Sequence, residues 1–436
     1  MPDKQVKKES PEVVTLKNGI RVVAATLKER KSVAVGIWVA VGARHETQKL
    51  AGVSHYLEHL VFKGTHKRTA NQIKESVEGV GGSLNAFTSE ECTCFLVKSA
   101  SRHFENVFDV LSDMVLSASL KEADIEKERT VILEEIKMTQ DQPSQLADEN
   151  LSELLWPEHV LGRPIAGTLK TVKGLTPDEI RNYRDRYYRP GLITVVAAGD
   201  IASKKLVSAV ESRFGRTQAL QEPQTAVFKG VQSKPKVKIF NKKTEQVHLA
   251  LGLHSLPKEH PDQYALDLLN VVLGGNMSSR LFNEVREERG LAYDIGSYQR
   301  HFNETGAFMV SAGVDSKKLP EALKVILAEL EKVREHLVKP DELKRAKEFY
   351  LGQLELGLEN SMSQMLWIGE SVLATGKPKA LKEITRRVEA TRLEDLKNIA
   401  RRLFVRGSLN LSVVGEIPVS RQEDFLKVLS CFPHSA

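Results

Sequence analysis

The pattern of apolar and polar residues predicts a chain in which strands and amphipathic helices follow one another throughout. Apolar and alternating runs predict strands at 13–16, 20–25, 33–40, 83–88, 92–97 and 192–198. The pair Asn18-Gly19 between the first two runs predicts a hairpin turn. Helical periodicity predicts helices at 70–80, 103–117, 122–140, 144–156 and 177–188. Both element types occur along the whole chain, which favours an α+β fold.

The order of elements in the first half recurs in the second half. Residues 176–200, a helix followed by a buried strand that ends in Gly-Asp, correspond to residues 392–416, where the strand ends in Gly-Glu. Residues 94–116, a strand followed by a helix, correspond to residues 307–330. Identities are few but the order is preserved, so the sequence predicts two structurally similar halves.

A stretch rich in Gln, Thr and Pro interrupts this rhythm at mid-chain and reads as a linker. The predicted organisation is therefore an N-terminal domain at 1–215, a linker at 216–237 and a C-terminal domain at 238–436. A chain of 436 residues is also too long for a single ordinary core, which agrees with more than one domain.

Composition narrows the functional classes. The chain is 41% hydrophobic and 28% charged, as in a soluble globular protein, and no apolar run reaches the roughly 18 residues of a membrane span. The net charge of +6 is dispersed, without the dense basic block of a nucleic-acid site. The N-terminus has no secretory or transit pattern, and three cysteines are an odd number. We expect no nucleic-acid or membrane partner and a cytoplasmic location.

The strongest chemical signal is the run His55-Tyr56-Leu57-Glu58-His59. On a helix, the two histidines at i and i+4 project from one face and can share a zinc ion. Glu58 projects on the same side and is placed to take a proton from a zinc-bound water. The spacing H-x-x-E-H is one of the zinc-peptidase signatures. From these five residues alone, the alternative is two helix histidines that pair with carboxylates on a solvated face.

The longer run His55-x-x-Glu58-His59-Leu60-Val61-Phe62-Lys63-Gly64-Thr65 resembles the opening motif of the M16 metallopeptidases. These are the pitrilysin and insulinase family of inverzincins, which includes the mitochondrial processing peptidase. The resemblance implies two homologous α/β-sandwich halves, each an antiparallel-rich sheet flanked by helices, that form a clamshell. It also implies a zinc-dependent endopeptidase for short or unfolded peptides in an enclosed chamber. The length is similar to the half-size members, which work as dimers, so we expect a homodimer.

The resemblance also implies the third zinc ligand. Residues 128–135 are similar to the family segment that carries a ligating glutamate, which points to Glu135 rather than Glu134. Glu128 lies seven residues earlier, on nearly the same helix face, and is expected to orient or charge-balance the site. Read without the resemblance, each is an ordinary carboxylate of an acidic helix. We expect one zinc ion per chain, with Glu58 as the general base.

Two further segments resemble substrate-binding elements of the family. The strand Asn85-Ala86-Phe87-Thr88 is similar to an edge strand to which a peptide adds by backbone pairing. Arg286 and Tyr293 match an arginine and a tyrosine that reach the substrate from the second half. The alternatives are an internal strand with a buried Phe87, and a charged helix followed by a half-buried tyrosine.

One other class of function stays open. A non-catalytic homologue would serve as the structural or partner subunit of a heterodimeric peptidase or a larger complex. Such subunits lose metal ligands, or divide the zinc motif and the Arg/Tyr pair between two chains. This chain has both sets together, which favours an active homodimer.

Overall fold

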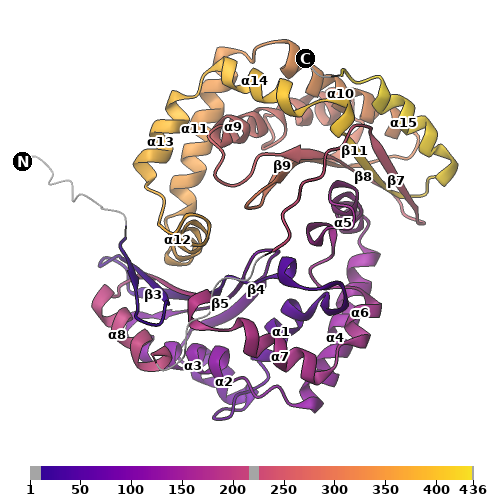
Figure 1. Cartoon of the computed structure of the whole chain (residues 1–436). Helices are drawn as coiled ribbons and strands as arrows, with labels where there is room; N and C mark the ends of the chain where they lie inside the picture. Colours follow the sequence, from indigo (N-terminus) through magenta and orange to yellow (C-terminus); the bar gives the residue numbers. More distant parts are fainter. Residues whose placement is uncertain (1–10, 216–224, 435–436) are drawn as a thin grey trace, which may run out of the picture. The chain divides into compact units, whose positions relative to one another are not determined.

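The computed structural model describes residues 11–215 and 225–434, which form two compact units. Each unit contains one mixed β-sheet with helices packed against it (Figure 1). The predicted α+β class is therefore confirmed. Of the described residues, the first unit comprises 11–133, 165–215, Thr225 and Leu356–Ile384, and the second comprises Glu134–Pro164, Ala226–Glu355 and 385–434.

The sheet of the first unit has the strand order β1-β2-β6-β3-β5-β4, which leaves β4 at an edge. The strands β3 and β6 are buried along nearly their whole length because helices pack on the sheet. The strands are β1 (Val13–Thr15), β2 (Arg21–Thr26), β3 (Ser32–Val39), β4 (Ser83–Thr88), β5 (Thr93–Ala100) and β6 (Ile193–Gly199). The helices are α1 (Val53–Val61), α2 (Ala70–Glu78), α3 (Phe104–Ser117), α6 (Leu169–Gly174), α7 (Pro177–Tyr187), α8 (Ser203–Phe214) and α12 (Ser361–Thr375), and α4 (Glu122–Asp141) begins in this unit.

The sheet of the second unit has the order β7-β11-β8-β10-β9. Its strands are β7 (Lys236–Asn241), β8 (Val247–Ser255), β9 (Ala292–His301), β10 (Gly306–Val314) and β11 (Asn410–Gly415). The helices are α5 (Pro143–Leu155), α9 (Gln263–Leu273), α10 (Leu319–Glu335), α11 (Pro340–Gly357), α13 (Leu381–Ala390), α14 (Leu393–Leu403) and α15 (Gln422–Ser430). A short π-helix, Phe282–Glu287, precedes β9.

The two sheets have the same connectivity, as the internal repeat predicts. When β1 is left out and the strands of each sheet are counted in chain order, the first sheet has the spatial order first, fifth, second, fourth, third. The second sheet has the same spatial order. In both, the first and fifth strands pair in parallel and the remaining pairs are antiparallel. The edge strand β9, which carries Tyr293, is the counterpart of the edge strand β4.

The halves exchange one helix each, which the predicted domain boundaries do not describe. Helix α5, from the first half, packs on β8 and β11, and α12, from the second half, packs on β3 and β6 (Figure 1). The boundaries 1–215 and 238–436 follow the strands of each sheet, but the compact units are discontinuous in sequence. Periodicity predicts that a helix has an apolar face without indicating which sheet will cover it. Of the predicted linker, 216–224 lies outside the described residues and 225–235 contains no helix or strand.

The exchanged helices contribute to the core of the unit they join. Met365, Ile368 and Val372 of α12 are buried together with Trp38 and Cys94 of the first sheet. Burial of one such aliphatic side chain contributes about 1.5–3 kcal/mol. In the second unit, a matching cluster forms from the exchanged helix, the segment after it and the sheet, and it contains Leu146, Ala147, Leu151, Leu155, Trp156, Leu161, Ala250, Phe302, Ala307, Met309 and Val414.

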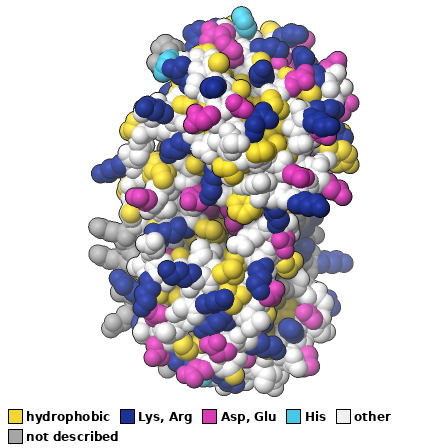
Figure 2. All heavy atoms as spheres, turned by 90° about the vertical axis from the view of Figure 1, so that its right-hand side faces the viewer, with side chains coloured by type: hydrophobic (Ala, Val, Ile, Leu, Met, Phe, Trp, Pro, Cys, Tyr) yellow, Lys and Arg dark blue, Asp and Glu magenta, His cyan; other side chains and the backbone are white. Residues whose placement is uncertain are grey.

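Surface charge is mixed on the face shown in Figure 2. Lys and Arg side chains are interspersed there with Asp and Glu rather than gathered in one patch. Across the part of the chain that the structure describes, no helix combines the length and the apolar character that crossing a membrane requires.

Candidate metal centre

Helix α1 is held at its N-terminus by a buried carboxylate. Glu46 is 5% exposed, and its two oxygens accept hydrogen bonds of 2.7 Å from the backbone N–H groups of Gly52 and Ser54. A negative charge is favourable here because the first N–H groups of a helix have no acceptor within it. The Ser54 hydroxyl also lies 3.0 Å from that of Tyr183 on α7. These contacts fix the helix that carries both motif histidines.

Gly167 packs against the backbone that precedes α1, and a side chain there should weaken the fold. Its φ is +75°, and a Cβ would lie 2.4 Å from the carbonyl oxygen of Ala51. We expect Gly167→Ala to lower the free energy of unfolding by about 1–3 kcal/mol, measured by urea denaturation. The control is Gly174→Ala, where a Cβ meets nothing within 4 Å. Equal stability of Gly167→Ala and the unmodified protein would contradict the expected clash.

His55 and His59 leave the same side of α1, as the i,i+4 spacing predicts. Their ring centroids are 4.7 Å apart. Burial, and then the neighbouring His59, lower the pKa of His55 to about 4. At neutral pH the His55 imidazole is therefore uncharged, which is the form that offers a nitrogen lone pair to a metal ion.

Helix α4 brings carboxylates to these histidines through its buried face. Glu128, Ile132 and Ile136 are buried at helical spacing, and Glu135 is partly exposed beside them. Tyr56 of α1 donates its hydroxyl hydrogen to the carbonyl of Ile125, which ties the two helices together. Val131, also on this helix, is 40% exposed.

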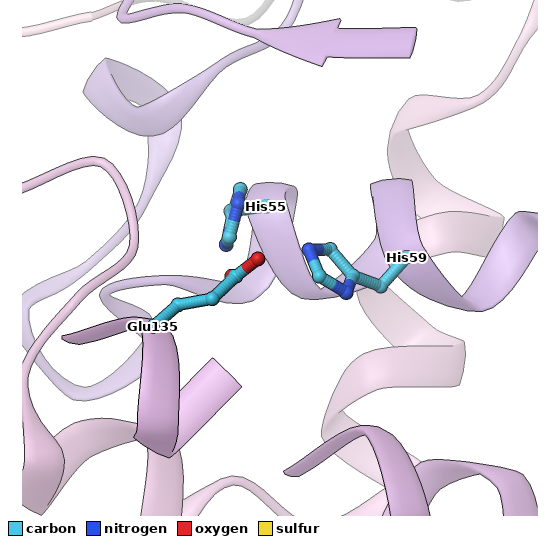
Figure 3. Close-up of side chains that lie close together, drawn as sticks. All are labelled: His55, His59 and Glu135. Carbon is cyan, nitrogen blue, oxygen red and sulfur yellow. The ribbon is translucent and has the colours of Figure 1, made fainter. Parts of the chain in front are cut away.

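His55, His59 and Glu135 lie close together (Figure 3). Each offers one ligand atom, and these atoms all lie within 4.8 Å of one another. Glu134, the neighbouring alternative, is instead exposed and pairs with Lys137 at 2.7 Å. Zinc binds His nitrogen and carboxylate oxygen at about 2.0–2.2 Å, and catalytic zinc sites use three protein ligands. Two imidazoles and one carboxylate are a donor set of this kind, so the three residues are possible zinc ligands.

Glu128 lies behind His59 rather than in the cluster itself. One of its oxygens is 3.2 Å from His59 Nδ1. Because this contact engages Nδ1, a metal ion at His59 would bind Nε2. A hydrogen bond from the second ring nitrogen to a carboxylate is the usual support of a metal-bound histidine.

Glu58 projects from α1 toward the edge strand of the sheet. The Thr88 hydroxyl, at the end of β4, donates a 2.6 Å hydrogen bond to Glu58 Oε2. This bond orients the Glu58 carboxylate. The sequence predicts Thr88 as a substrate-binding residue; its contact with Glu58 was not anticipated.

The strand β4, predicted at an edge, is an edge strand: among the described strands it pairs with β5 alone. The N–H of Ala86 donates to the side-chain oxygen of Asn85 at 2.9 Å. Phe87 is partly buried, with its ring 5.5 Å from that of Trp38 in an edge-to-face contact. The alternative of an internal strand is therefore excluded, while binding of substrate to this strand stays a prediction.

Arg286 and Tyr293 lie together in the second unit. The Arg286 guanidinium is 5.5 Å from the centre of the Tyr293 ring and 4.7 Å from that of Phe282. Both predicted residues line a pocket of about 380 Å³ with the polar side chains of Asp148, Gln246, His248 and Asp294. Tyr293 is 75% exposed, so its phenol is accessible to a ligand rather than half-buried.

Three supporting contacts, made by Glu46, Thr88 and Lys63, were not predicted from the sequence. The sequence marks Glu46 only as an acidic residue ahead of the helix. Its carboxylate reaches the N–H groups of Gly52 and Ser54 only because the loop between them folds back. Thr88 and Lys63 both lie within motifs noted in the sequence. Their partners are distant in sequence, because Thr88 contacts Glu58, 30 positions away, and Lys63 contacts Glu128, 65 positions away. Such pairings are set by the packing of α1 against β4 and α4.

Comparison with family models identifies the chain. Residues 21–169 match the Insulinase (Peptidase family M16) model, and residues 174–350 match the Peptidase M16 inactive domain model. The chain belongs to peptidase family M16. The resemblance of the His55–Thr65 run to this family is thereby confirmed.

Relatives in family M16 of similar length support this assignment. An uncharacterized zinc protease of Streptomyces coelicolor is 38% identical over 92% of this chain and 89% of its own length. An uncharacterized zinc protease of Bacillus subtilis is 38% identical over 89% of this chain and 95% of its own length. The chain is thus of the half-size type.

Solved structures show the same M16 fold. A protease from Helicobacter pylori superposes with a TM-score of 0.87 at 25% identity, over 93% of this chain and 99% of the other. A peptidase M16 inactive domain from Pseudomonas fluorescens superposes with a TM-score of 0.85 at 18% identity, over 94% of this chain and 98% of the other.

Proposed function

We propose that this M16 protein is a zinc-dependent endopeptidase that hydrolyses short or unfolded peptides. The observation that carries the proposal is the cluster of His55, His59 and Glu135, with Glu58 on the same helix as the histidines. When bound there, zinc would polarise the scissile carbonyl and increase the acidity of the attacking water. Relatives named as zinc proteases support the same activity.

The proposed roles follow from the contacts of each side chain. His55, His59 and Glu135 hold the metal, and one carboxylate with two neutral imidazoles leaves the centre a net positive charge. Glu58 removes a proton from the water that attacks the carbonyl carbon and delivers it to the amine nitrogen as the C–N bond breaks. Thr88 keeps the Glu58 carboxylate in place during both transfers.

Substrate binding is proposed at two elements. An extended peptide would pair with the open edge of β4, at residues 85–88, and displace the Asn85 side chain from the Ala86 N–H. Arg286 would bind a substrate carbonyl oxygen, and Tyr293 would support the oxyanion of the tetrahedral intermediate. Backbone pairing tolerates many sequences, so side-chain preferences must arise elsewhere.

Cleavage of a quenched fluorescent peptide library by the purified protein tests the proposal directly. We expect cleavage that a zinc chelator abolishes and that added zinc restores. Elemental analysis should give one zinc ion per chain, because the described residues contain one group of potential ligands of this kind. Cleavage that persists after complete removal of zinc would contradict the proposed mechanism.

Replacement of Thr88 separates orientation of the base from substrate binding. We expect Thr88→Val to lower kcat by about tenfold or more, since a hydrogen bond to a charged group is worth roughly 1.5–3 kcal/mol. Zinc content should not change, and Thr88→Ser should recover most of the activity because it restores the hydroxyl. Steady-state kinetics on one fluorescent peptide measure kcat and KM. An effect confined to KM would indicate that Thr88 only binds substrate.

The second candidate is a non-catalytic partner subunit. It is favoured by the match of residues 174–350 to a domain described as inactive. Under this alternative, the protein binds zinc but cleaves no peptide until a related chain is added. The peptide library assay, repeated with the related M16 chains of the same organism, distinguishes the two candidates.

The remaining proposals concern assembly and location. We propose a homodimer with an enclosed chamber, supported by the half-size length that this chain shares with its relatives. Light scattering of the purified protein gives the oligomeric state. A cytoplasmic location is supported by Cys92, Cys94 and Cys431, which form no disulfide in the part of the chain that the structure describes.

A further inference from the structure

Lys63 and His59 reach the same carboxylate from one end of α1. Lys63 lies in the turn that follows α1, four residues after His59. Lys63 Nζ is 2.7 Å from Glu128 Oε1, and His59 Nδ1 is 3.2 Å from Glu128 Oε2. Each oxygen of Glu128 thus has its own partner, one on α1 and one in the turn that follows α1.

The Glu128 carboxylate is buried, so its contact with Lys63 affects the stability of its charge. Glu128 is 2% exposed, whereas the Lys63 side chain is 35% exposed and reaches in from the surface. A buried carboxylate is costly unless it is paired and hydrogen-bonded. His59 is neutral when it binds a metal ion, so it supplies a hydrogen bond without a balancing charge. Among the described residues, Lys63 is the one Lys or Arg that forms an ion pair with Glu128.

We propose that Lys63 is a positioning residue for the metal centre. Its ammonium group balances the charge of Glu128 and holds the carboxylate so that Oε2 faces His59 Nδ1. The bound carboxylate in turn fixes the imidazole with Nε2 toward His55 and Glu135. The inference rests on the proposed zinc site, and it assigns Lys63 a role in zinc affinity rather than in the reaction itself.

Zinc affinity, measured by competition with a chromophoric chelator, tests this inference without an activity assay. We expect Lys63→Met to weaken zinc binding by about 10–100-fold, the usual cost of losing a partner behind a ligand. Lys63→Arg keeps the positive charge and should recover most of the affinity. Lys67→Met, which removes an exposed lysine nearby, is the matched control and should bind zinc as the unmodified protein does.

A double-mutant cycle with Glu128→Gln shows whether Lys63 acts through the carboxylate. In that background, Lys63→Met should change the affinity by less than about threefold, since no buried charge remains to be held. Additive effects, or unchanged affinity in a folded Lys63→Met, would overturn the inference while the zinc site stands. If the unmodified protein binds no zinc, the proposed function fails first. Circular dichroism of the metal-free variants verifies folding, and Lys63→Gln, which also removes the positive charge, replaces Lys63→Met in the cycle if the latter does not fold.

Discussion

Glu58→Gln should reduce peptide hydrolysis by about 10²–10⁴-fold, the usual contribution of a general base. The amide keeps the size of the side chain and can still accept the hydrogen bond from Thr88, but it cannot take a proton from water. Zinc content should be unchanged, because Glu58 is not part of the cluster of potential ligands. The measurement is kcat on a quenched fluorescent peptide, with zinc determined on the same preparation.

The matched control for this variant is Glu78→Gln. Glu78 is an exposed carboxylate at the end of α2, and its replacement makes the same chemical change elsewhere in the first unit. We expect full activity from this control. If Glu58→Gln retained more than about a tenth of the normal kcat, another group would have to act as the base.

Neighbouring glutamates on α4 should differ sharply in their effect on the metal. Glu135→Gln should lose zinc at concentrations that saturate the unmodified protein, and hydrolysis should fall below about one-hundredth, because a catalytic zinc site requires three protein ligands. Glu134→Gln should keep both zinc and activity. Its carboxylate is exposed and pairs with Lys137, a surface contact worth at most about 1 kcal/mol.

This pair of variants also tests the helix register. Loss of zinc in Glu134→Gln with retention in Glu135→Gln would show that α4 presents its other carboxylate to the histidines. Equal loss in both variants would indicate disruption of the helix rather than removal of a ligand. Unfolding of both variants in urea distinguishes disruption from ligand loss.

Local patterns were sufficient for much of the architecture. The helices α3, α4, α5 and α7 end within one residue of their predicted bounds, because apolar periodicity and capping residues act over a few positions. The i,i+4 spacing of His55 and His59 was also enough to place both rings on one face. The exchange of α5 and α12 was not predictable, since an amphipathic face is compatible with either sheet.

By itself, the sequence determined the α+β class, the repeat of two similar halves, the M16 family and the pair of histidines on one helix. These features depend on residue order and short-range spacing. The family resemblance also pointed to Glu135, which lies beside the histidines. Only the tertiary structure decided that Thr88 holds Glu58 and that Glu46 caps α1. The physical reason is that each of these contacts joins groups from separate elements, whose distance is set by how the elements pack. Lys63 illustrates this division. Its spacing from His59 is visible in the sequence, but the contact of both residues with the buried Glu128 depends on how the elements pack.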